Sequence, residues 1–227
     1  MTKPLAIIVG AGEGLGTSLA SCFTSAGYQV IGLNRSHTQN NSNDILIKQI
    51  DASDADSVQQ TMDELLKQYG SPNVVIHNPA QLDIKPFLET STKDFEYAWK
   101  SMVLSAINIL HAAIPYMLQQ GSGTIIASGA TASIRSGVNF SAFSSAKFAL
   151  RGLMQSLARE YQKQGIHIAH VILDGILDTT RSRELHSLDP EKMMSTDDVA
   201  EAYLQLVLQK PSAWTHELDL RPKTETF

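Results

Sequence analysis

The sequence predicts an α/β protein in which helices cover both faces of a doubly wound parallel sheet of about seven strands. Short apolar runs, rich in β-branched residues, alternate with longer runs whose apolar residues recur at helical spacing. This alternation implies right-handed crossovers, which place helices on each side of a parallel sheet. The length of 227 residues and the 43% hydrophobic content fit one domain spanning residues 1–227.

The first three elements form a β-α-β unit. Leu5 to Val9 is a short apolar run that ends in glycines, as expected of a strand buried on both faces. Gly14 to Ala26 has apolar residues at helical spacing, and Gly27 suits the left-handed position after a helix. A second strand is expected at Tyr28 to Leu33.

The later elements continue the alternation. Further strands are expected at Ile45 to Ile50, Asn73 to His77, Thr124 to Ser128, Ile166 to Leu173 and Glu217 to Pro222. Further helices are expected at Ala55 to Tyr69, Phe95 to Leu118 and Ala142 to Gln162. Pro115 is expected to bend or end the second of these helices. The polar segment from Asp178 to Thr196 is expected to be a mobile loop near the substrate.

Composition excludes several classes of protein. The net charge is −5 with acids and bases interspersed, which argues against a nucleic-acid-binding surface. The longest apolar run near the N-terminus, Leu5 to Val9, is far shorter than the ~20 residues of a membrane span. Cys22 is the only cysteine, so no internal disulfide can form. We therefore expect a cytoplasmic protein that binds neither nucleic acid nor membrane.

Four glycines lie between the first strand and the first helix. They are Gly10, Gly12, Gly14 and Gly16, with Leu15 between the last two. Glycine lets the backbone turn tightly and approach a pyrophosphate, while the N–H groups at the start of the helix attract negative charge. The loop is therefore a candidate dinucleotide site, although a plain strand-to-helix turn also favours glycine.

The second strand is followed by Asn34, Arg35 and Ser36, where a dinucleotide would place its adenosine ribose. An acidic residue there would favour NAD(H), whereas arginine favours the 2'-phosphate of NADP(H). The sequence thus favours NADP(H) over NAD(H). Glu13 argues the other way, because a carboxylate repels a phosphate, and a solvated loop cation is the alternative interpretation of Arg35.

Two later loops add motifs, His77-Asn78-Pro79-Ala80 and Asp174-Gly175-Ile176-Leu177-Asp178-Thr179. Together with the Gly-x-x-x-Gly-x-Gly pattern of Gly10, Gly14 and Gly16, these motifs resemble those of the short-chain dehydrogenase/reductase family. The resemblance extends from about Leu5 to Ala200. The resemblance implies a Rossmann-type fold that binds NAD(P). It also implies cofactor contacts at Asp51, Ala52, Asn78, Pro79, Ala80, Gly175, Ile176 and Thr179.

The family's proton chemistry uses asparagine, serine, tyrosine and lysine. The resemblance aligns Met102, Ala130, Phe143 and Lys147 with these positions, so only the lysine is retained. It implies a catalytic role for Lys147 and a contact with the cofactor ribose; a lysine on the helix surface is the alternative. Phenylalanine has no titratable proton, and loss of a general acid costs ~10²–10⁴ in rate.

Substitute groups are few. Ser128 and Thr131 carry hydroxyls that would either point into the site or bond nearby backbone groups. Asp174 would either act as a base or stabilise the Asp-Gly turn. His186 lies in the expected substrate loop. No metal site is expected.

Two functions fit this pattern. The first is an atypical oxidoreductase that binds NADP(H) and acts on a small carbonyl or alcohol. The alternative is a catalytically inactive NAD(P)-binding sensor or regulatory protein. The resemblance also implies a homodimer or homotetramer formed through the two long helices.

Overall fold

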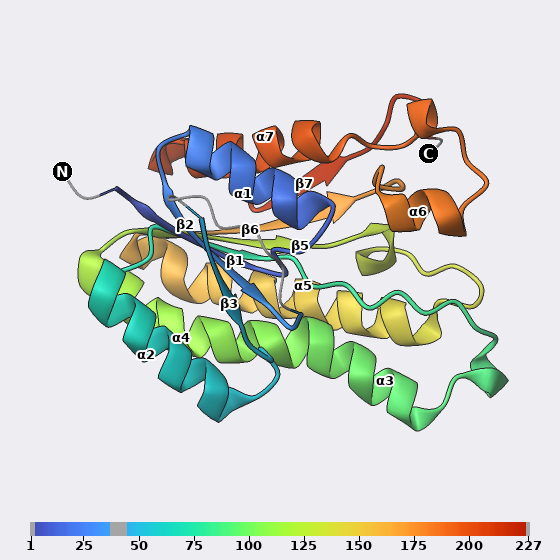
Figure 1. Ribbon diagram of the computed structural model, residues 1–227, viewed down its shortest axis with the longest axis horizontal. Helices are drawn as coiled ribbons and strands as arrows, with labels where there is room; N and C mark the ends of the chain where they lie inside the picture. Colours follow the sequence, from blue (N-terminus) through green and yellow to red (C-terminus); the bar gives the residue numbers. More distant parts are fainter. Residues whose placement is uncertain (1–2, 37–44, 226–227) are drawn as a thin grey trace.

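The computed structural model describes residues 3–36 and 45–225 (Figure 1). Within these residues the strands form one parallel sheet in the order β3-β2-β1-β4-β5-β6-β7. The strands are β1 (Leu5–Val9), β2 (Gln29–Asn34), β3 (Ile45–Gln49), β4 (Val74–His77), β5 (Gly123–Ser128), β6 (Ile166–Leu173) and β7 (Glu217–Leu220). The predicted fold class is confirmed.

Helices cover both faces of this sheet. The helices are α1 (Leu15–Ser25), α2 (Ala55–Tyr69), α3 (Thr92–Trp99), α4 (Ser105–Gln120), α5 (Ser141–Tyr161), α6 (Thr180–Leu185) and α7 (Thr196–Val207). One face carries α1 and α7, which pack together, and the other carries α2, α4 and α5 (Figure 1).

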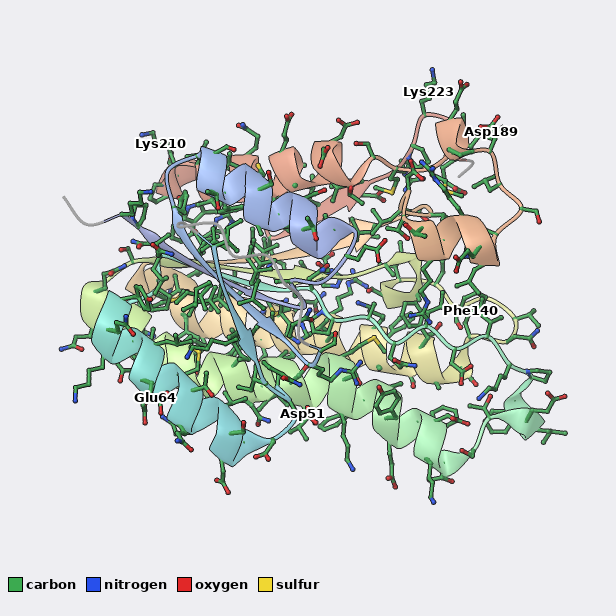
Figure 2. All side chains as sticks on the ribbon, in the orientation of Figure 1. Asp51, Glu64, Phe140, Asp189, Lys210 and Lys223 are labelled. Carbon is green, nitrogen blue, oxygen red and sulfur yellow. The ribbon has the colours of Figure 1, made fainter. Side chains whose placement is uncertain are left out.

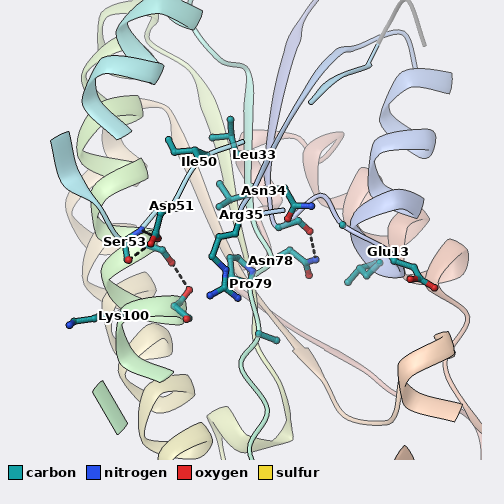
Figure 3. Close-up of a pocket in the computed structure, with 18 of the residues that line it drawn as sticks. Glu13, Leu33, Asn34, Arg35, Ile50, Asp51, Ser53, Asn78, Pro79 and Lys100 are labelled. Carbon is teal, nitrogen blue, oxygen red and sulfur yellow. Dashed lines mark hydrogen bonds between the residues drawn. The ribbon is translucent and has the colours of Figure 1, made fainter. Parts of the chain in front are cut away.

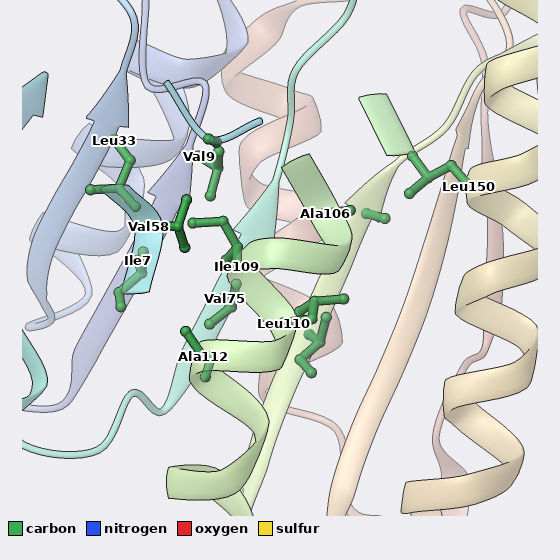
Figure 4. Packing of buried hydrophobic residues seen from close by; sticks show 14 of the residues in the cluster. Ile7, Val9, Leu33, Val58, Val75, Ala106, Ile109, Leu110, Ala112 and Leu150 are labelled. Carbon is green, nitrogen blue, oxygen red and sulfur yellow. The ribbon is translucent and has the colours of Figure 1, made fainter. Parts of the chain in front are cut away.

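Alternate residues of each central strand enter different cores. Leu5, Ile7 and Val9 of β1 belong to the cluster on the α2–α4–α5 face, and Figure 4 shows Val58 between β1 and Ile109 of α4. Ala6 and Ile8 belong to the cluster on the α1–α7 face. Since both faces are buried, these strands show continuous apolar runs rather than alternation.

The structure differs from the sequence-based expectations in the segment around α6 and α7. Residues expected to form a mobile loop include the short helix α6, and Leu177 forms a parallel bridge with Met194. The helix α7 was not predicted, although Val199, Ala200, Tyr203 and Leu206 are buried at helical spacing against α1. The acidic start of α7 and its exposed polar residues hid this pattern.

Helical structure runs continuously from Thr92 to Gln120, because a π-helical segment (Lys100–Leu104) joins α3 to α4. Pro115 lies inside α4 and does not end it. By length and hydropathy alone this run is sufficient to cross a membrane, but 61% of its most apolar window is buried inside the fold. Its buried apolar residues, such as Ile109 and Met117, belong to the core on the α2–α4–α5 face.

Charged side chains such as Lys210 and Lys223 project from the rim of the molecule (Figure 2). This places them away from the carboxyl ends of β1 and β4, where the candidate site lies.

Candidate functional site

A cleft of about 700 Å³ opens at the carboxyl ends of β1, β2, β3 and β4. Ligands of open α/β sheets bind at this edge, where the strand order reverses. Predicted cofactor residues that line the cleft are Gly10, Gly12, Leu15, Asn34, Arg35, Asp51, Ala52, Asn78, Pro79, Ala80 and Thr179. In Figure 3, Asp51 and Ser53 lie on one side of Arg35, and Glu13 lies on the other side, near the glycine loop.

The glycine loop has the backbone geometry of an anion cradle. Gly14 is the N-cap of α1 with φ 88°, and no side chain caps the helix there. The first N–H groups of α1 are therefore available to a ligand phosphate. A Cβ at Gly16 would lie 2.3 Å from the Gly10 carbonyl oxygen, so only glycine permits this close packing of helix and loop.

The adenosine side of the cleft combines a fixed carboxylate with a cation. Asp51 accepts hydrogen bonds from the Ser53 N–H (2.9 Å) and the Ser53 hydroxyl (2.8 Å). These bonds, with a smaller contribution from the Arg35 charge, lower the pKa of Asp51. Gln49 Nε2 donates to the Arg35 carbonyl oxygen at 2.9 Å, which fixes the backbone after β2.

Asn78 holds the centre of the cleft in place. Its Nδ2 donates to the Gly10 carbonyl oxygen at 3.2 Å, and its Oδ1 accepts from the Ser128 hydroxyl at 2.8 Å. The Ser128 hydroxyl also lies 2.8 Å from the Tyr203 hydroxyl. Asn78 therefore links the loops after β1 and β4 to β5.

Several predicted site residues lie outside the lining of this cleft. Gly14 lines a smaller adjoining hollow with Thr179, and Gly16 packs beneath the loop. A Cβ at Gly175 would come within 2.6 Å of Pro222, so this glycine permits close approach of the C-terminal segment. The other predicted residues outside the lining are Ser36, Ile176 and Lys147.

Lys147 is buried, not on the helix surface. Its Nζ donates a hydrogen bond to the Ser128 carbonyl oxygen at 2.6 Å and lies 5.8 Å from the centre of the Phe143 ring. Burial lowers the pKa of Lys147 to about 8. The residues that the resemblance aligns with the other catalytic positions are Met102, which is buried; Phe143, also buried; and Ala130, which packs against the same core.

The lowered pKa of Lys147 predicts a stability change with pH. Above pH 8 the folded protein releases the proton that the unfolded chain keeps until about pH 10.5, so stability rises through this window. The Lys147→Met variant lacks this titrating group, so the stability of the original protein relative to this variant should rise by about 2 kcal/mol between pH 7.5 and pH 9.5. Urea unfolding of both proteins at both pH values measures the difference; an unchanged difference would contradict the buried ammonium.

The hydroxyl and carboxyl groups considered as substitutes already have partners. Thr131 donates to Asp174 Oδ1 at 2.5 Å, and Arg221 and Arg135 lie 3.0 and 3.3 Å from Asp174 Oδ2. Asp174 thus ties the loop after β5 to the C-terminal segment. Ser128 is committed to Asn78 and Tyr203, as described above.

Sequence reasoning missed the contribution of α3, the π-helical segment and the first residue of α4. Tyr97, Lys100, Ser101 and Ser105 all line the cleft. The Ser105 hydroxyl donates to the Ser101 carbonyl oxygen at 2.6 Å and lies 2.8 Å from His77 Nε2. Burial, followed by the Lys147 charge, lowers the pKa of His77 to about 3, so the imidazole is neutral. The only sequence signal was two serines spaced by one helical turn.

The segment before α7 closes the remaining side of the cleft. Leu177, Thr179, Arg181 and Ser182 line it. The Thr180 hydroxyl donates to Glu13 Oε1 at 2.7 Å, which joins α6 to the glycine loop. His186 caps the end of α6. Among the described residues, no group of three or more His, Cys, Asp or Glu side chains is arranged to hold a metal ion.

Comparison with known proteins agrees with this geometry. Residues 4–189 match the family model for short chain dehydrogenase, and the chain belongs to this family. It is 26% identical to an uncharacterized oxidoreductase of Staphylococcus aureus (strain MRSA252), with 98% of each chain covered. It is thus an oxidoreductase-family protein with an NAD(P)-binding fold.

Two solved structures show the same fold. A short-chain dehydrogenase from Rhodopseudomonas palustris has a TM-score of 0.80 and 30% identity, covering 96% of this chain and 98% of that one. ElxO with NADP bound has a TM-score of 0.90 and 21% identity, with coverages of 97% and 98%.

Proposed function

We propose that this protein is an NADP(H)-binding oxidoreductase that acts on a small carbonyl or alcohol through a proton pathway different from the family's usual one. The observation that carries this proposal is the cleft at the switch point of the sheet, with the glycine loop on one side and Arg35 on the other. ElxO, which shares the fold, has been solved with NADP bound.

The residues present fit a dinucleotide. The N–H groups at the start of α1 and the glycine loop would hold the pyrophosphate, because no side chain caps this end of the helix. Asp51 and Ala52 would meet the adenine, and Arg35 would hold the 2'-phosphate. When bound, the nicotinamide supplies hydride transfer.

The proton pathway is where this chain departs from the family. At the aligned positions, Phe143, Ala130 and Met102 carry no group that donates a proton at neutral pH. Ser105 does bring a hydroxyl to the cleft, backed by the neutral imidazole of His77. Other proton sources are water, the substrate and the side chains of Tyr97, Lys100 and Ser101, which also line the cleft.

A second function, a cofactor-binding sensor without turnover, is favoured by one observation. Lys147 directs its ammonium to the Ser128 carbonyl oxygen and faces a phenyl ring where the family has a phenol. A tyrosine-to-phenylalanine variant of ElxO, which shares the fold, is described with NADPH bound, so a protein of this fold binds the nucleotide after losing one tyrosine hydroxyl.

A turnover assay separates the two functions. The protein is mixed with NADPH and a panel of small aldehydes and ketones, and NADPH absorbance is followed. The oxidoreductase is expected to turn over slowly, at ~0.1 s⁻¹ or less, because a typical rate of ~10 s⁻¹ is reduced by loss of the general acid. Saturable NADPH binding without oxidation of any panel member would favour the sensor instead.

A further inference from the structure

Tyr97 of α3 contacts the arginine at the rim of the cleft. Arg35 Nη1 donates a hydrogen bond to the Tyr97 hydroxyl, and the Arg35 Cζ atom lies 5.4 Å from the centre of the Tyr97 ring. Both residues line the cleft, yet they are 62 positions apart in the sequence. The contact therefore joins the end of β2 to α3 across the adenosine side.

The helix that carries Tyr97 is held firmly at both ends. At its start, the Ser91 hydroxyl and backbone N–H both bond Asp94 in a capping box. At its other end, α3 continues into the π-helical segment, whose residues Lys100 and Ser101 also line the cleft. Such segments shift the face that a helix presents and are frequent at functional sites.

The chemistry of this pair suits a phosphate. A hydroxyl partner, unlike a carboxylate, does not form an ion pair with Arg35, so the contact with Tyr97 leaves the guanidinium able to attract a phosphate. A guanidinium has five N–H donors in a rigid fork, and the bond to Tyr97 uses a donor on Nη1 only. The Asp51 carboxylate attracts Arg35 more weakly than it interacts with Ser53, whose N–H and hydroxyl both bond Asp51 Oδ1.

We propose that Tyr97 is a positioning residue for nucleotide specificity, which holds the Arg35 guanidinium ready for the 2'-phosphate of NADP(H). A long, exposed side chain loses rotamer freedom when it binds a ligand, and a pre-formed contact reduces that loss. This inference rests on the proposed function, because it requires that the cleft take NADP(H).

The test compares the affinities of NADPH and NADH for four proteins, measured by nicotinamide fluorescence: the original chain, Tyr97→Phe, Arg35→Ala and the double variant. Tyr97→Phe keeps the ring and removes the hydroxyl. It should weaken NADPH about five-fold and change NADH less than two-fold. In the Arg35→Ala background the same change should have no further effect on NADPH, because Tyr97 acts through Arg35.

Tyr116→Phe is the matched control, because Tyr116 lies on α4 and packs against the core outside the cleft lining. It should leave both affinities unchanged. The inference is overturned if Tyr97→Phe weakens NADPH and NADH equally, or if it weakens neither. It is also overturned if Tyr97→Phe still weakens NADPH binding in the Arg35→Ala background. If Arg35→Ala is selective while Tyr97→Phe is silent, the proposed function stands and only this inference fails. If the original chain binds neither nucleotide, both fail.

Discussion

Replacing Arg35 with alanine should weaken NADPH binding by about 10- to 100-fold while changing NADH binding less than two-fold. The guanidinium lines the adenosine side of the cleft, where only NADPH carries a 2'-phosphate. Hydrogen bonds from a cation to a phosphate are worth ~1.5–3 kcal/mol, which corresponds to the stated range. Nicotinamide fluorescence titration of both nucleotides measures the two losses.

Arg181 provides the matched control for this variant. It is an exposed arginine that also lines the cleft, but from α6 on the side of the glycine loop. Arg181→Ala should therefore affect NADPH and NADH to the same extent, because both nucleotides share the pyrophosphate. Equal losses of the two nucleotides in Arg35→Ala would refute a 2'-phosphate contact.

The double variant Phe143→Tyr, Ala130→Ser should oxidise NADPH at least ~100-fold faster than the original protein with the best member of the carbonyl panel. It restores a phenol one helical turn before Lys147 and a hydroxyl in the loop after β5. The buried ammonium of Lys147 lies near the Phe143 ring, so it would favour ionisation of the new phenol. A positioned general acid contributes ~10²–10⁴ in rate.

Phe140→Tyr is the control for adding a phenol. Phe140 immediately precedes α5 and does not have the four-residue spacing to Lys147. This variant should not raise the rate. NADPH titration of each variant confirms that the nucleotide site is retained. A double variant that binds NADPH but turns over no faster than the original chain would refute the assigned roles of positions 130 and 143.

Most of the sheet could be predicted from the sequence, because strands buried on both faces appear as short apolar runs. The strands β1 and β6 begin and end where expected, as does the helix α2. The helix α7 was missed because its buried residues are separated by acidic and polar ones. The bond between Asp174 and Thr131 depends on two loops that meet only in the folded chain.

The candidate site was only partly predictable. The glycines and the residues that follow β2, β3 and β4 gave local signals, since each stands directly after a strand. Tyr97 and Lys100 gave none, because they reach the cleft only through the packing of α3 and the π-helical segment. The burial of Lys147 likewise depends on the contact between α5 and the end of β5.

The central claim is that the cleft binds NADP(H), and a direct titration of the original protein tests it. NADPH and NADH are each added while nicotinamide fluorescence is recorded at moderate ionic strength. The account predicts saturable binding of NADPH that is at least ten-fold tighter than that of NADH, because one charged phosphate contact distinguishes them. If neither NADPH nor NADH shows saturable binding, the central claim is contradicted.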